Sequence, residues 1–297
     1  MPTYTFQEKS GRFYLRERWY DHGHRKERIL VTFGSRPKIH APDFRLGDAA
    51  LLVQSLPRAS VQLVFTSPPY SFLKEGTWPS WEAYHDFLDG VWRGCFQAMD
   101  YGGRLVVNIA DEHVPASATV PHQILPNGAE IAHRCRKLGF LFMGRILWAK
   151  PRGFASSGGG SAIGSGPQQL PGEFLFPSEH EEVLIFKKPG RRTRSPSDAE
   201  KKASRLRDWR SLYTDRWVLQ GERGASKSAA FPLELAIRVV RMFSFVGDTV
   251  LDPFTGTGTT LLAASLLGRR GIGFEKSPAT YAAALDRLHK DLARRRG

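Results

Sequence analysis

A buried strand that ends in two consecutive prolines constrains this chain more than any other feature. The apolar run Val61–Phe65 has the length and composition of a buried strand, and residues 66–70, Thr-Ser-Pro-Pro-Tyr, follow it directly. Because proline donates no backbone N–H and restricts the residue before it, the chain leaves the sheet here as a stiff, extended loop. Open α/β sheets bind ligands at the carboxyl ends of their strands. The loop is therefore a candidate active-site loop, with a plain strand terminator as the alternative.

A second strand–loop junction lies near the other end of the chain. Residues 252–260, Asp-Pro-Phe-Thr-Gly-Thr-Gly-Thr-Thr, follow the apolar residues 249–251 and open a helical pattern. Glycines let a backbone pass close to a ligand, and the helix N-terminus behind them points free N–H groups at a carboxylate or phosphate. A phosphate-binding loop would need lysine where Thr259 stands, and a dinucleotide-binding loop would need glycine where Leu261 stands. Neither of those two motifs is complete.

Together the two stretches resemble the amino-group DNA methyltransferases that use S-adenosylmethionine. In that family a Ser/Asp/Asn-Pro-Pro-Tyr loop holds the target amine, and an Asp-Pro-Phe-x-Gly-x-Gly turn holds the cofactor. The catalytic loop comes first along this chain, which resembles the β-class order, and the likeness runs from about Asp43 to about Leu288. The family often has His-Pro-Ala-x-Phe-Pro before the next helix, whereas residues 227–232 here read Lys-Ser-Ala-Ala-Phe-Pro. Only the Phe-Pro half of that segment carries over.

The resemblance implies a catalytic loop made of Ser67, Pro68, Pro69 and Tyr70. The Ser67 hydroxyl and the Pro68 carbonyl would accept hydrogen bonds from an exocyclic amine and aim its lone pair at the methyl group. The two prolines would supply the preorganisation for this direct in-line displacement. Tyr70 would stack on the target base, which has to flip out of a duplex to reach the loop.

The resemblance also implies a cofactor site in which acids flank the glycine turn. Asp252 would meet the amino-acid ammonium, Glu275 the ribose hydroxyls and Asp48 the adenine end of the cofactor. From the residues alone, Asp48 and Asp252 also fit as helix caps, and Glu275 as a surface acid. The full predicted set is Asp48, Phe231, Asp252, Pro253, Phe254, Gly256, Thr257, Gly258, Thr259 and Glu275.

The two cysteines and the hydropathy exclude several other classes. Cys95 and Cys135 are alone and far apart, so neither a disulfide framework nor a Cys-rich zinc site is available, and no metal is predicted. A carbon-5 cytosine enzyme would need a nucleophilic cysteine after a proline, which neither residue provides, so no covalent enzyme–base intermediate is expected. No signal peptide and no apolar run of about 18 residues is present, and a reduced, cytoplasmic location follows as the default.

The charge of the chain favours a polyanionic partner. Lys and Arg number 43 against 29 Asp and Glu, a net charge of +14 at pH 7. A basic run spans residues 187–210, between the catalytic loop and the cofactor turn, where the resembled family carries its target-recognition region. The run predicts contacts with the DNA backbone, and a solvated face is the alternative. The predicted contact residues are Lys187, Lys188, Arg191, Arg192 and Arg194.

The rest of the chain divides by composition. Residues 1–40 mix basic and aromatic side chains without a clear period, and this N-terminal arm either contacts nucleic acid or packs on the domain or on a second subunit. Residues 41–297 are expected to form the methyltransferase domain, with 152–226 as a target-recognition insertion that opens with a Gly/Ser-rich loop. By resemblance, the fold is α/β, with a largely parallel, seven-stranded Rossmann-like sheet, flanked by helices and containing one antiparallel strand.

The sequence thus predicts an S-adenosylmethionine-dependent DNA methyltransferase of the restriction–modification type. Cytosine N4 is the predicted target because Ser-Pro-Pro-Tyr accompanies mainly cytosine in the resembled family, whereas Asp-Pro-Pro-Tyr accompanies mainly adenine. The alternatives are an adenine N6 enzyme of the same fold, an RNA base methyltransferase and a catalytically silent DNA-binding protein. The predicted partner is double-stranded DNA, with a cognate restriction endonuclease as a further candidate, no membrane, and a monomer or homodimer as the assembly.

Overall fold

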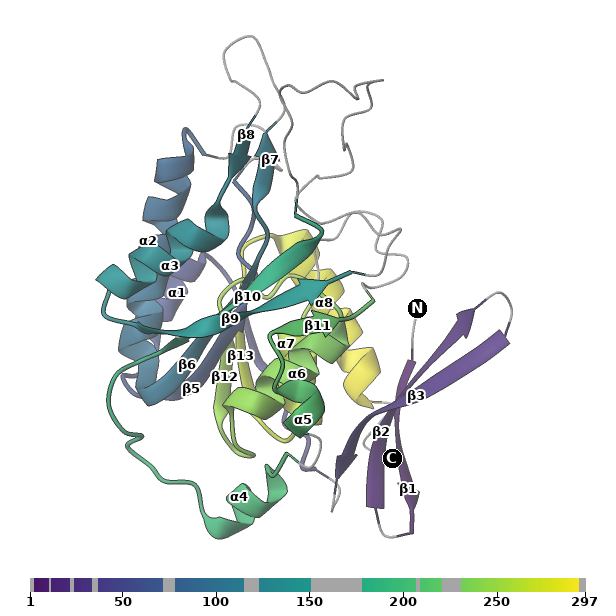
Figure 1. Cartoon of the computed structure of the whole chain (residues 1–297). Coiled ribbons are helices and arrows are strands. Elements are labelled where there is room, and N and C mark those ends of the chain that lie inside the picture. The colour runs from purple at the N-terminus through teal and green to yellow at the C-terminus, as the bar shows by residue number, and fades with distance from the viewer. Residues whose placement is uncertain are drawn as a thin grey trace, which may run out of the picture.

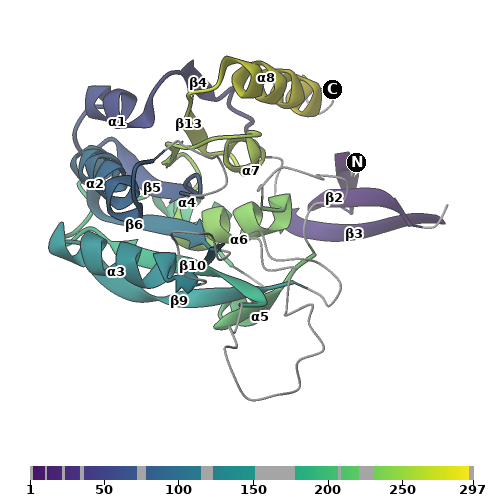
Figure 2. The ribbon, with the colours of Figure 1, turned by 90° about the horizontal axis from the view of Figure 1, so that it is seen from above.

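The structure is a computed structural model that describes residues 3–10, 12–21, 24–33, 37–71, 78–114, 123–150, 178–206, 209–220 and 231–293. At its centre a β-sheet has helices on both faces (Figures 1 and 2). Within these residues, the strand order is β11-β9-β10-β6-β5-β12-β13-β4. Those strands are β4 (Asp43–Leu46), β5 (Val61–Thr66), β6 (Met99–Ile109), β9 (Leu141–Ala149), β10 (His180–Lys187), β11 (Arg216–Val218), β12 (Thr249–Asp252) and β13 (Arg270–Glu275).

The remaining elements are helices and two small sheets. The helices are α1 (Ala49–Leu52), α2 (Trp81–Ala98), α3 (Asn127–Lys137), α4 (Asp198–Ala203), α5 (Trp209–Leu212), α6 (Leu233–Phe243), α7 (Thr259–Leu266) and α8 (Pro278–Ala293), with a 3-10 turn at Val53–Ser55. The small sheets are formed by β1 (Thr3–Lys9), β2 (Arg12–Asp21) and β3 (His24–Phe33), and by β7 (Glu112–Val114) and β8 (Gln123–Leu125).

The central sheet confirms the predicted fold class. Strand β10 is antiparallel to both of its neighbours, β6 and β9, and the other pairings in this sheet are parallel. The described part of the sheet has eight strands, one more than predicted, because the three-residue strand β11 adds to the edge beside β9. In the described part of the chain, no helix is long and apolar enough to cross a membrane.

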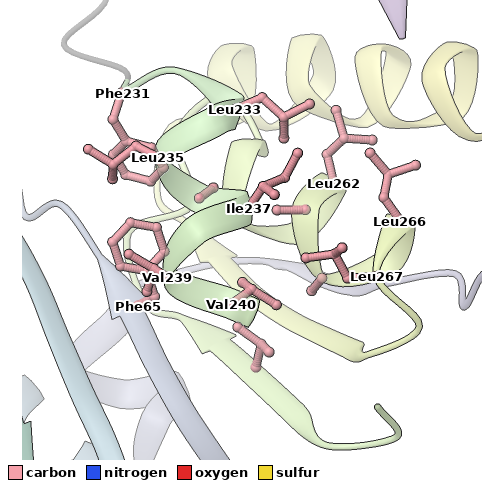
Figure 3. Close-up of a cluster of buried hydrophobic side chains, with 14 of the residues drawn as sticks. Phe65, Phe231, Leu233, Leu235, Ile237, Val239, Val240, Leu262, Leu266 and Leu267 are labelled. Carbon is pink, nitrogen blue, oxygen red and sulfur yellow. The ribbon is translucent and has the colours of Figure 1, made fainter. Parts of the chain in front are cut away.

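Two hydrophobic clusters, one on each face, explain why the central strands are largely apolar. Along β5, Leu63 and Phe65 pack with α6 and α7, and Val61 and Val64 pack with α1 and α2. Figure 3 shows the first cluster, in which side chains of α6 and α7 interlock and the ring of Phe231 lies on Phe65, with the centroids 4.8 Å apart. A strand buried on both faces reads as a continuous apolar run, the pattern from which β5 and β12 were predicted.

The direction of β10 decides which residues reach the carboxyl edge of the sheet, where the predicted catalytic loop lies. The residue pairs Val183↔Asn108 and Lys187↔Arg104 show that β10 starts at the carboxyl end of β6 and finishes at its amino end. Residues 188–206 therefore follow β10 at the amino edge, where α4 lies at the bottom of Figure 1. The loops after β5, β12 and β13 leave from the opposite, carboxyl edge.

Two parts of the range 152–226 belong to this central sheet. Strands β10 and β11 lie within that range and pair with β6 and β9, so residues 180–187 and 216–218 are parts of the sheet itself. The Gly/Ser-rich stretch predicted to be a functional loop falls in 151–177, outside the described residues. The described residues that flank it, Lys150 and Ser178, both stand at the carboxyl edge.

The N-terminal arm of the sequence analysis is a folded, three-stranded antiparallel sheet. Strands β1, β2 and β3 pair in chain order, and the register of β3 against β2 shifts after Leu15, where Leu30 is an extra residue of β3. That bulge interrupts the alternation of side chains, which explains why no clear period is evident in the sequence. Leu15 and Val31 are buried in the same cluster as α6, and Arg28 forms an ion pair of 2.7 Å with Glu234 of that helix. Of the alternatives left open by the sequence, packing on the domain is thus observed.

Candidate active site

The predicted catalytic loop is held by hydrogen bonds at both of its ends. At its start, the Thr66 hydroxyl donates to Oδ1 of Asp252 over 2.6 Å, which joins the end of β5 to the end of β12. Beyond it Ser67 is half-buried, Pro68 is buried and Pro69 is exposed. The structure therefore brings the predicted catalytic loop and the cofactor turn side by side at the carboxyl edge.

Two further contacts hold the far end of this loop. The Tyr70 hydroxyl accepts a hydrogen bond of 3.2 Å from the backbone N–H of Ala110, just after β6. The Ser71 hydroxyl donates to Glu112 over 2.5 Å. Tyr70 is 6% exposed, and its burial, followed by the charge of Glu181, raises the pKa of its phenol well above the usual value. In this structure, Tyr70 is a buried, neutral side chain of fixed orientation.

The cofactor turn has backbone angles that only glycine adopts easily. Gly256 has φ +53° and Gly258 has φ +85°, both in the left-handed region. A Cβ on Gly256 would meet only the Phe254 carbonyl oxygen, at 3.9 Å, so the space outside the turn is open. Gly258 directly precedes α7, whose N-terminus thus opens at this turn. An open cradle in front of a helix N-terminus fits the carboxylate end of the predicted cofactor.

Glycine on β13 lets the helix behind the turn approach the sheet closely. A Cβ on Gly273 would lie 2.3 Å from the Thr255 hydroxyl and 2.7 Å from a methyl carbon of Leu261. No side chain fits in that space. The close helix–strand packing that a third glycine of the turn supplies in dinucleotide-binding loops is thus supplied here from the neighbouring strand.

Asp252 is a buried carboxylate at the junction of the loop and the turn. It is 1% exposed, and its Oδ1 accepts from the Thr66 hydroxyl and from the Phe254 N–H at 3.1 Å. Burial raises the pKa of Asp252 to about 6, although both hydrogen bonds act in the opposite direction. Asp252 does not cap α7, whose N-cap is Gly258; it holds the turn through Phe254, and a nearby cation can change its charge state.

The two other predicted acids lie at the carboxyl ends of the adjacent strands β4 and β13, Asp48 just after β4 and Glu275 at the end of β13. Glu275 accepts hydrogen bonds from the backbone N–H of Gly256 at 3.1 Å and of Ser277 at 2.8 Å. Asp48 caps α1 by accepting from Ala50 N–H at 2.9 Å. The Gly47 N–H donates to the Glu275 carbonyl, so both carboxylates stand at the ends of the paired strands β4 and β13.

Five other residues of the predicted cofactor set are engaged in contacts within the protein. Arg287 of α8 donates to both threonine hydroxyls of the turn, at 3.1 Å to Thr257 and 3.2 Å to Thr259, which ties the turn to that helix. Phe231 packs on Phe65, and Phe254 lies against Phe87 and Trp92. Pro253 is buried.

A buried polar triad beside the catalytic loop was missed by the sequence analysis. Glu181, which is 2% exposed, accepts from Lys150 at 2.7 Å and from the Asn108 side chain at 2.6 Å. The three residues lie at the carboxyl edge of β6, β9 and β10, next to the strand that carries the loop. A lysine just after one apolar strand and a glutamate at the start of the next were the available signals. Their meeting depends on strand pairing, which the sequence did not show.

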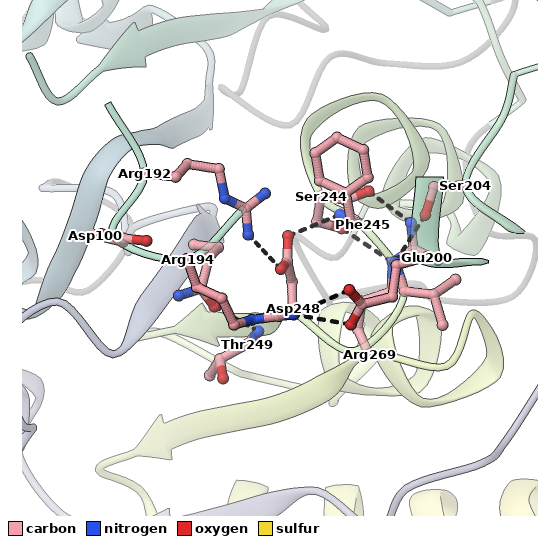
Figure 4. A network of polar contacts seen from close by, with 12 residues as sticks. Asp100, Arg192, Arg194, Glu200, Ser204, Ser244, Phe245, Asp248, Thr249 and Arg269 are labelled. Atoms are coloured by element: carbon pink, nitrogen blue, oxygen red, sulfur yellow. Dashed lines mark hydrogen bonds and ion pairs between the residues drawn. The ribbon is translucent and has the colours of Figure 1, made fainter. Parts of the chain in front are cut away.

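The basic run lies at the opposite edge from this site. Arg192 pairs with Asp248 at 2.5 Å and lies over the ring of Phe245, and Arg194 makes two 2.9 Å contacts with Glu200, as Figure 4 shows. These partners precede β12 or belong to α4. The full length of the sheet lies between them and the catalytic loop.

The other residues predicted to contact DNA also lie at the amino edge of the sheet. Lys188 is 7% exposed, donates to the Met99 carbonyl at 2.7 Å and lies over the rings of Phe96 and Tyr101. Lys187 is half-buried, and Arg191 is exposed. The DNA contacts predicted for these five residues stay a prediction, and their position at the amino edge does not favour it.

The cysteines are unsuited to nucleophilic chemistry. Cys95 and Cys135 are fully buried, and burial raises the pKa of both thiols well above the usual value. A thiol that stays protonated is a poor nucleophile. This agrees with a reaction that passes through no covalent enzyme–base intermediate.

Comparison with known proteins identifies the relatives of this chain. The sequence model of the N6/N4 DNA methylases, described as DNA methylase, matches residues 61–286. The Type II methyltransferase M.MjaI of Methanocaldococcus jannaschii is 32% identical over 256 residues, which are 73% of this chain and 81% of the relative.

Solved structures agree with that match. TTHA0409 of Thermus thermophilus, solved in complex with S-adenosyl-L-methionine, is 39% identical with a TM-score of 0.70, over 84% of this chain and 94% of the other. The cytosine-N4-specific PvuII DNA methyltransferase shares the fold with a TM-score of 0.63, at 20% identity, over 88% of this chain and 94% of the other.

Proposed function

This chain belongs to the N6/N4 DNA methylase family, and from that premise we propose that it methylates the exocyclic N4 amine of cytosine in duplex DNA. Membership makes it a DNA methyltransferase of the restriction–modification type with S-adenosylmethionine as its cofactor. The family acts on the amines of adenine and of cytosine. The choice of cytosine rests on one observation, the serine at position 67 that opens the catalytic loop.

A serine at this position suits cytosine for a chemical reason. Both amines offer two N–H groups, and serine or aspartate can accept from one of them. The ring nitrogen N3 of cytosine is more basic than N1 of adenine. An ionised acid beside cytosine would therefore favour a protonated ring, which withdraws the amine lone pair. A neutral hydroxyl on Ser67 avoids that, whereas the adenine enzyme of the same fold remains the alternative.

The loop contacts support catalysis by positioning. Exocyclic amines are poor nucleophiles because their lone pairs are delocalised into the ring. The Ser67 hydroxyl and Pro68 carbonyl are proposed to accept the two amine hydrogens and to direct the lone pair outward. The contacts Thr66–Asp252 and Tyr70–Ala110 hold the loop from both sides, so little reorganisation is needed when a base enters. The cofactor supplies the electrophilic methyl group.

Base flipping and base contact extend the proposal. A base stacked in a duplex cannot reach a loop at the edge of a sheet, so the target is extruded. Because the Tyr70 ring is held by Ala110 and largely buried, we propose that it forms the floor on which the extruded base lies. The buried Lys150–Glu181–Asn108 triad stands beside the same loop, and we assign it to the wall of that pocket.

The cofactor residues fit the chemistry of their ligand. Asp252 is proposed to face the ammonium of the cofactor, the open turn at Gly256 and the start of α7 its carboxylate, and Glu275 and Asp48 its ribose and adenine end. A carboxylate close to an ammonium is stabilised in its ionised form. Cofactor binding is therefore coupled to the titration of Asp252.

That coupling predicts a pH dependence of cofactor affinity. The pKa of Asp252 is about 6 in the free protein, and the bound ammonium lowers it, so binding releases a proton below that pH. We expect the Kd for S-adenosylhomocysteine to be constant above pH 6 and to rise by up to about tenfold per unit below it. Calorimetry between pH 5 and 8 measures this. Asp252→Asn should bind weakly with no such dependence, and an unchanged pH profile in that variant would place the titration elsewhere.

The experiment that tests the function is methylation-aware sequencing of DNA from cells that express the chain, beside a labelled-methyl assay on DNA and RNA. We expect methyl groups in duplex DNA at one short sequence, on cytosine N4. Label in RNA alone would favour the RNA methyltransferase, and cofactor binding without transfer would favour the silent DNA-binding protein. We also propose that a cognate restriction endonuclease acts on the same site and that the protein is a monomer or a homodimer. Residues within 152–226 are proposed to form the target-recognition region.

A further inference from the structure

The outer face of the N-terminal sheet gathers positive charge. Cross-strand partners in a sheet point to the same side, so the register Phe6↔Leu15↔Val31 marks the inner face, which packs on the domain. The cross-strand pairs whose side chains point the other way, away from the domain, form the outer face. They place five basic residues and one acidic residue there, a net charge of +4, namely Lys9, Arg12, Arg16, Arg18, Arg25 and Glu27.

The exposure of these side chains makes them available to a partner. Lys9, Arg12 and Arg25 are exposed. Arg16 and Arg18 share the acid of this face, Glu27, at 2.5 Å and 3.1 Å, and their side chains are 19% and 31% exposed. One carboxylate between two guanidiniums leaves the pair cationic. Surface ion pairs of this kind are worth about 1 kcal/mol or less, so a polyanion can compete for the arginines.

The N-terminal sheet precedes the residues matched by the family model and packs on the catalytic domain. Its residues precede 61, where the match to the DNA methylase family begins. Its inner face packs with α6, and the Arg28–Glu234 ion pair joins it to the same helix. Figure 2 shows β2 and β3 extending outward past α6.

We propose that this outer face binds the phosphate backbone of duplex DNA beside the methylated site. This inference rests on the proposed function, because it assumes that DNA is the substrate. Strand β2 has ten residues and spans about 30 Å, close to one turn of B-form DNA. Arginine guanidiniums bind phosphates through paired N–H groups, and such contacts carry no sequence information. The face thus raises affinity for any duplex, and the catalytic edge reads the target.

The charge pattern favours DNA over a protein partner. The centre of a protein interface is enriched in aromatic residues and depleted of charge. Among the described side chains of this face, Ile29 is a large apolar one that is exposed, and it lies opposite Arg16. A cationic, weakly apolar face of this length matches a nucleic-acid backbone.

The test compares two triple variants with the same change in charge. The first, Lys9→Gln with Arg12→Gln and Arg25→Gln, removes the three exposed positive charges of the outer face and lowers its net charge from +4 to +1. The control, Arg93→Gln with Arg136→Gln and Lys137→Gln, neutralises three exposed residues of α2 and α3, outside the sites and the recognition region proposed above. Both full-length proteins are titrated with a fluorescent 40-base-pair duplex of mixed sequence and S-adenosylhomocysteine, from about 50 to 200 mM salt. Melting temperature and S-adenosylhomocysteine affinity report folding.

We expect the first variant to bind the duplex about 10- to 100-fold more weakly at low salt, with a log–log salt slope smaller by about 2 to 3. Its KM for DNA should rise while kcat at saturating DNA stays unchanged, and the control should stay within about twofold of wild type. Equal losses in both variants, or a normal slope in the first, would overturn the inference. So would a loss for RNA with none for duplex DNA. A wild-type protein that transfers no methyl group to DNA would refute the proposed function instead.

Discussion

Replacing Ser67 with alanine is expected to lower methyl transfer by about 100-fold or more, while the protein stays folded and keeps its affinity for S-adenosylhomocysteine. The hydroxyl is one of two acceptors proposed to hold the amine, and removing one preorganised polar contact of this kind typically costs about 10²- to 10³-fold in kcat. Ser67 is half-buried, and the loop around it is held by Thr66 and Tyr70, so the change leaves the backbone in place. Single-turnover kinetics measure the loss.

Ser67→Asn serves as the matched control for that variant. Asparagine keeps a neutral acceptor and occurs at this position in the wider family. Its rate should therefore lie between those of wild type and Ser67→Ala. Equal rates for Ser67→Ala and wild type would show that the Ser67 hydroxyl does not hold the target amine.

Replacing Gly256 with leucine should weaken S-adenosylhomocysteine binding by at least about 100-fold. The residue has φ +53°, and a side chain there projects into the open space outside the turn, where the cofactor carboxylate is proposed to lie. The left-handed backbone adds a cost of about 1–2 kcal/mol to the fold, which the melting temperature reports. Calorimetry measures the affinity.

Gly90→Leu provides the comparison for this variant. Gly90 lies within α2, and a Cβ there meets nothing within 4 Å. The same substitution at that position should leave cofactor affinity unchanged. If Gly256→Leu binds as tightly as Gly90→Leu, the turn does not hold the cofactor.

The two strand–loop junctions could be predicted from the sequence because local residues determine them. An apolar run followed by two prolines has to end a strand, and two glycines before a helical pattern have to form a turn. The placement of Thr66 beside Asp252 then follows from parallel pairing of β5 with β12 at one edge. The largely parallel sheet with one antiparallel strand was predicted from the resemblance to the amino-group DNA methyltransferases, and it is confirmed.

Features that depend on long-range pairing could not be predicted in the same way. The basic run follows β10, and only the antiparallel direction of that strand carries Arg192 and Arg194 to the edge opposite the catalytic loop. The Lys150–Glu181 pair joins the ends of two strands that the chain separates by 30 residues. Arg287 reaches Thr257 and Thr259 from a later helix. No pattern in the sequence around these residues indicates any of these contacts.

The N-terminal sheet was missed for a different reason. Alternation of polar and apolar residues identifies a strand when one face is buried and regular. The bulge opposite Leu15 shifts that alternation within β3, and the outer face mixes arginine with Tyr14. The basic and aromatic composition was therefore visible in the sequence, whereas the sheet that arranges it was not.

The central claim is that Ser67 opens a loop that methylates cytosine N4. The most direct measurement is mass spectrometry of the nucleosides from duplex DNA that the purified protein has methylated in vitro with S-adenosylmethionine, with Ser67→Ala as the inactive reference. We predict N4-methylcytosine in the wild-type sample and none in the reference. N6-methyladenine without N4-methylcytosine would contradict the assignment of the base, while the fold and the cofactor site would remain.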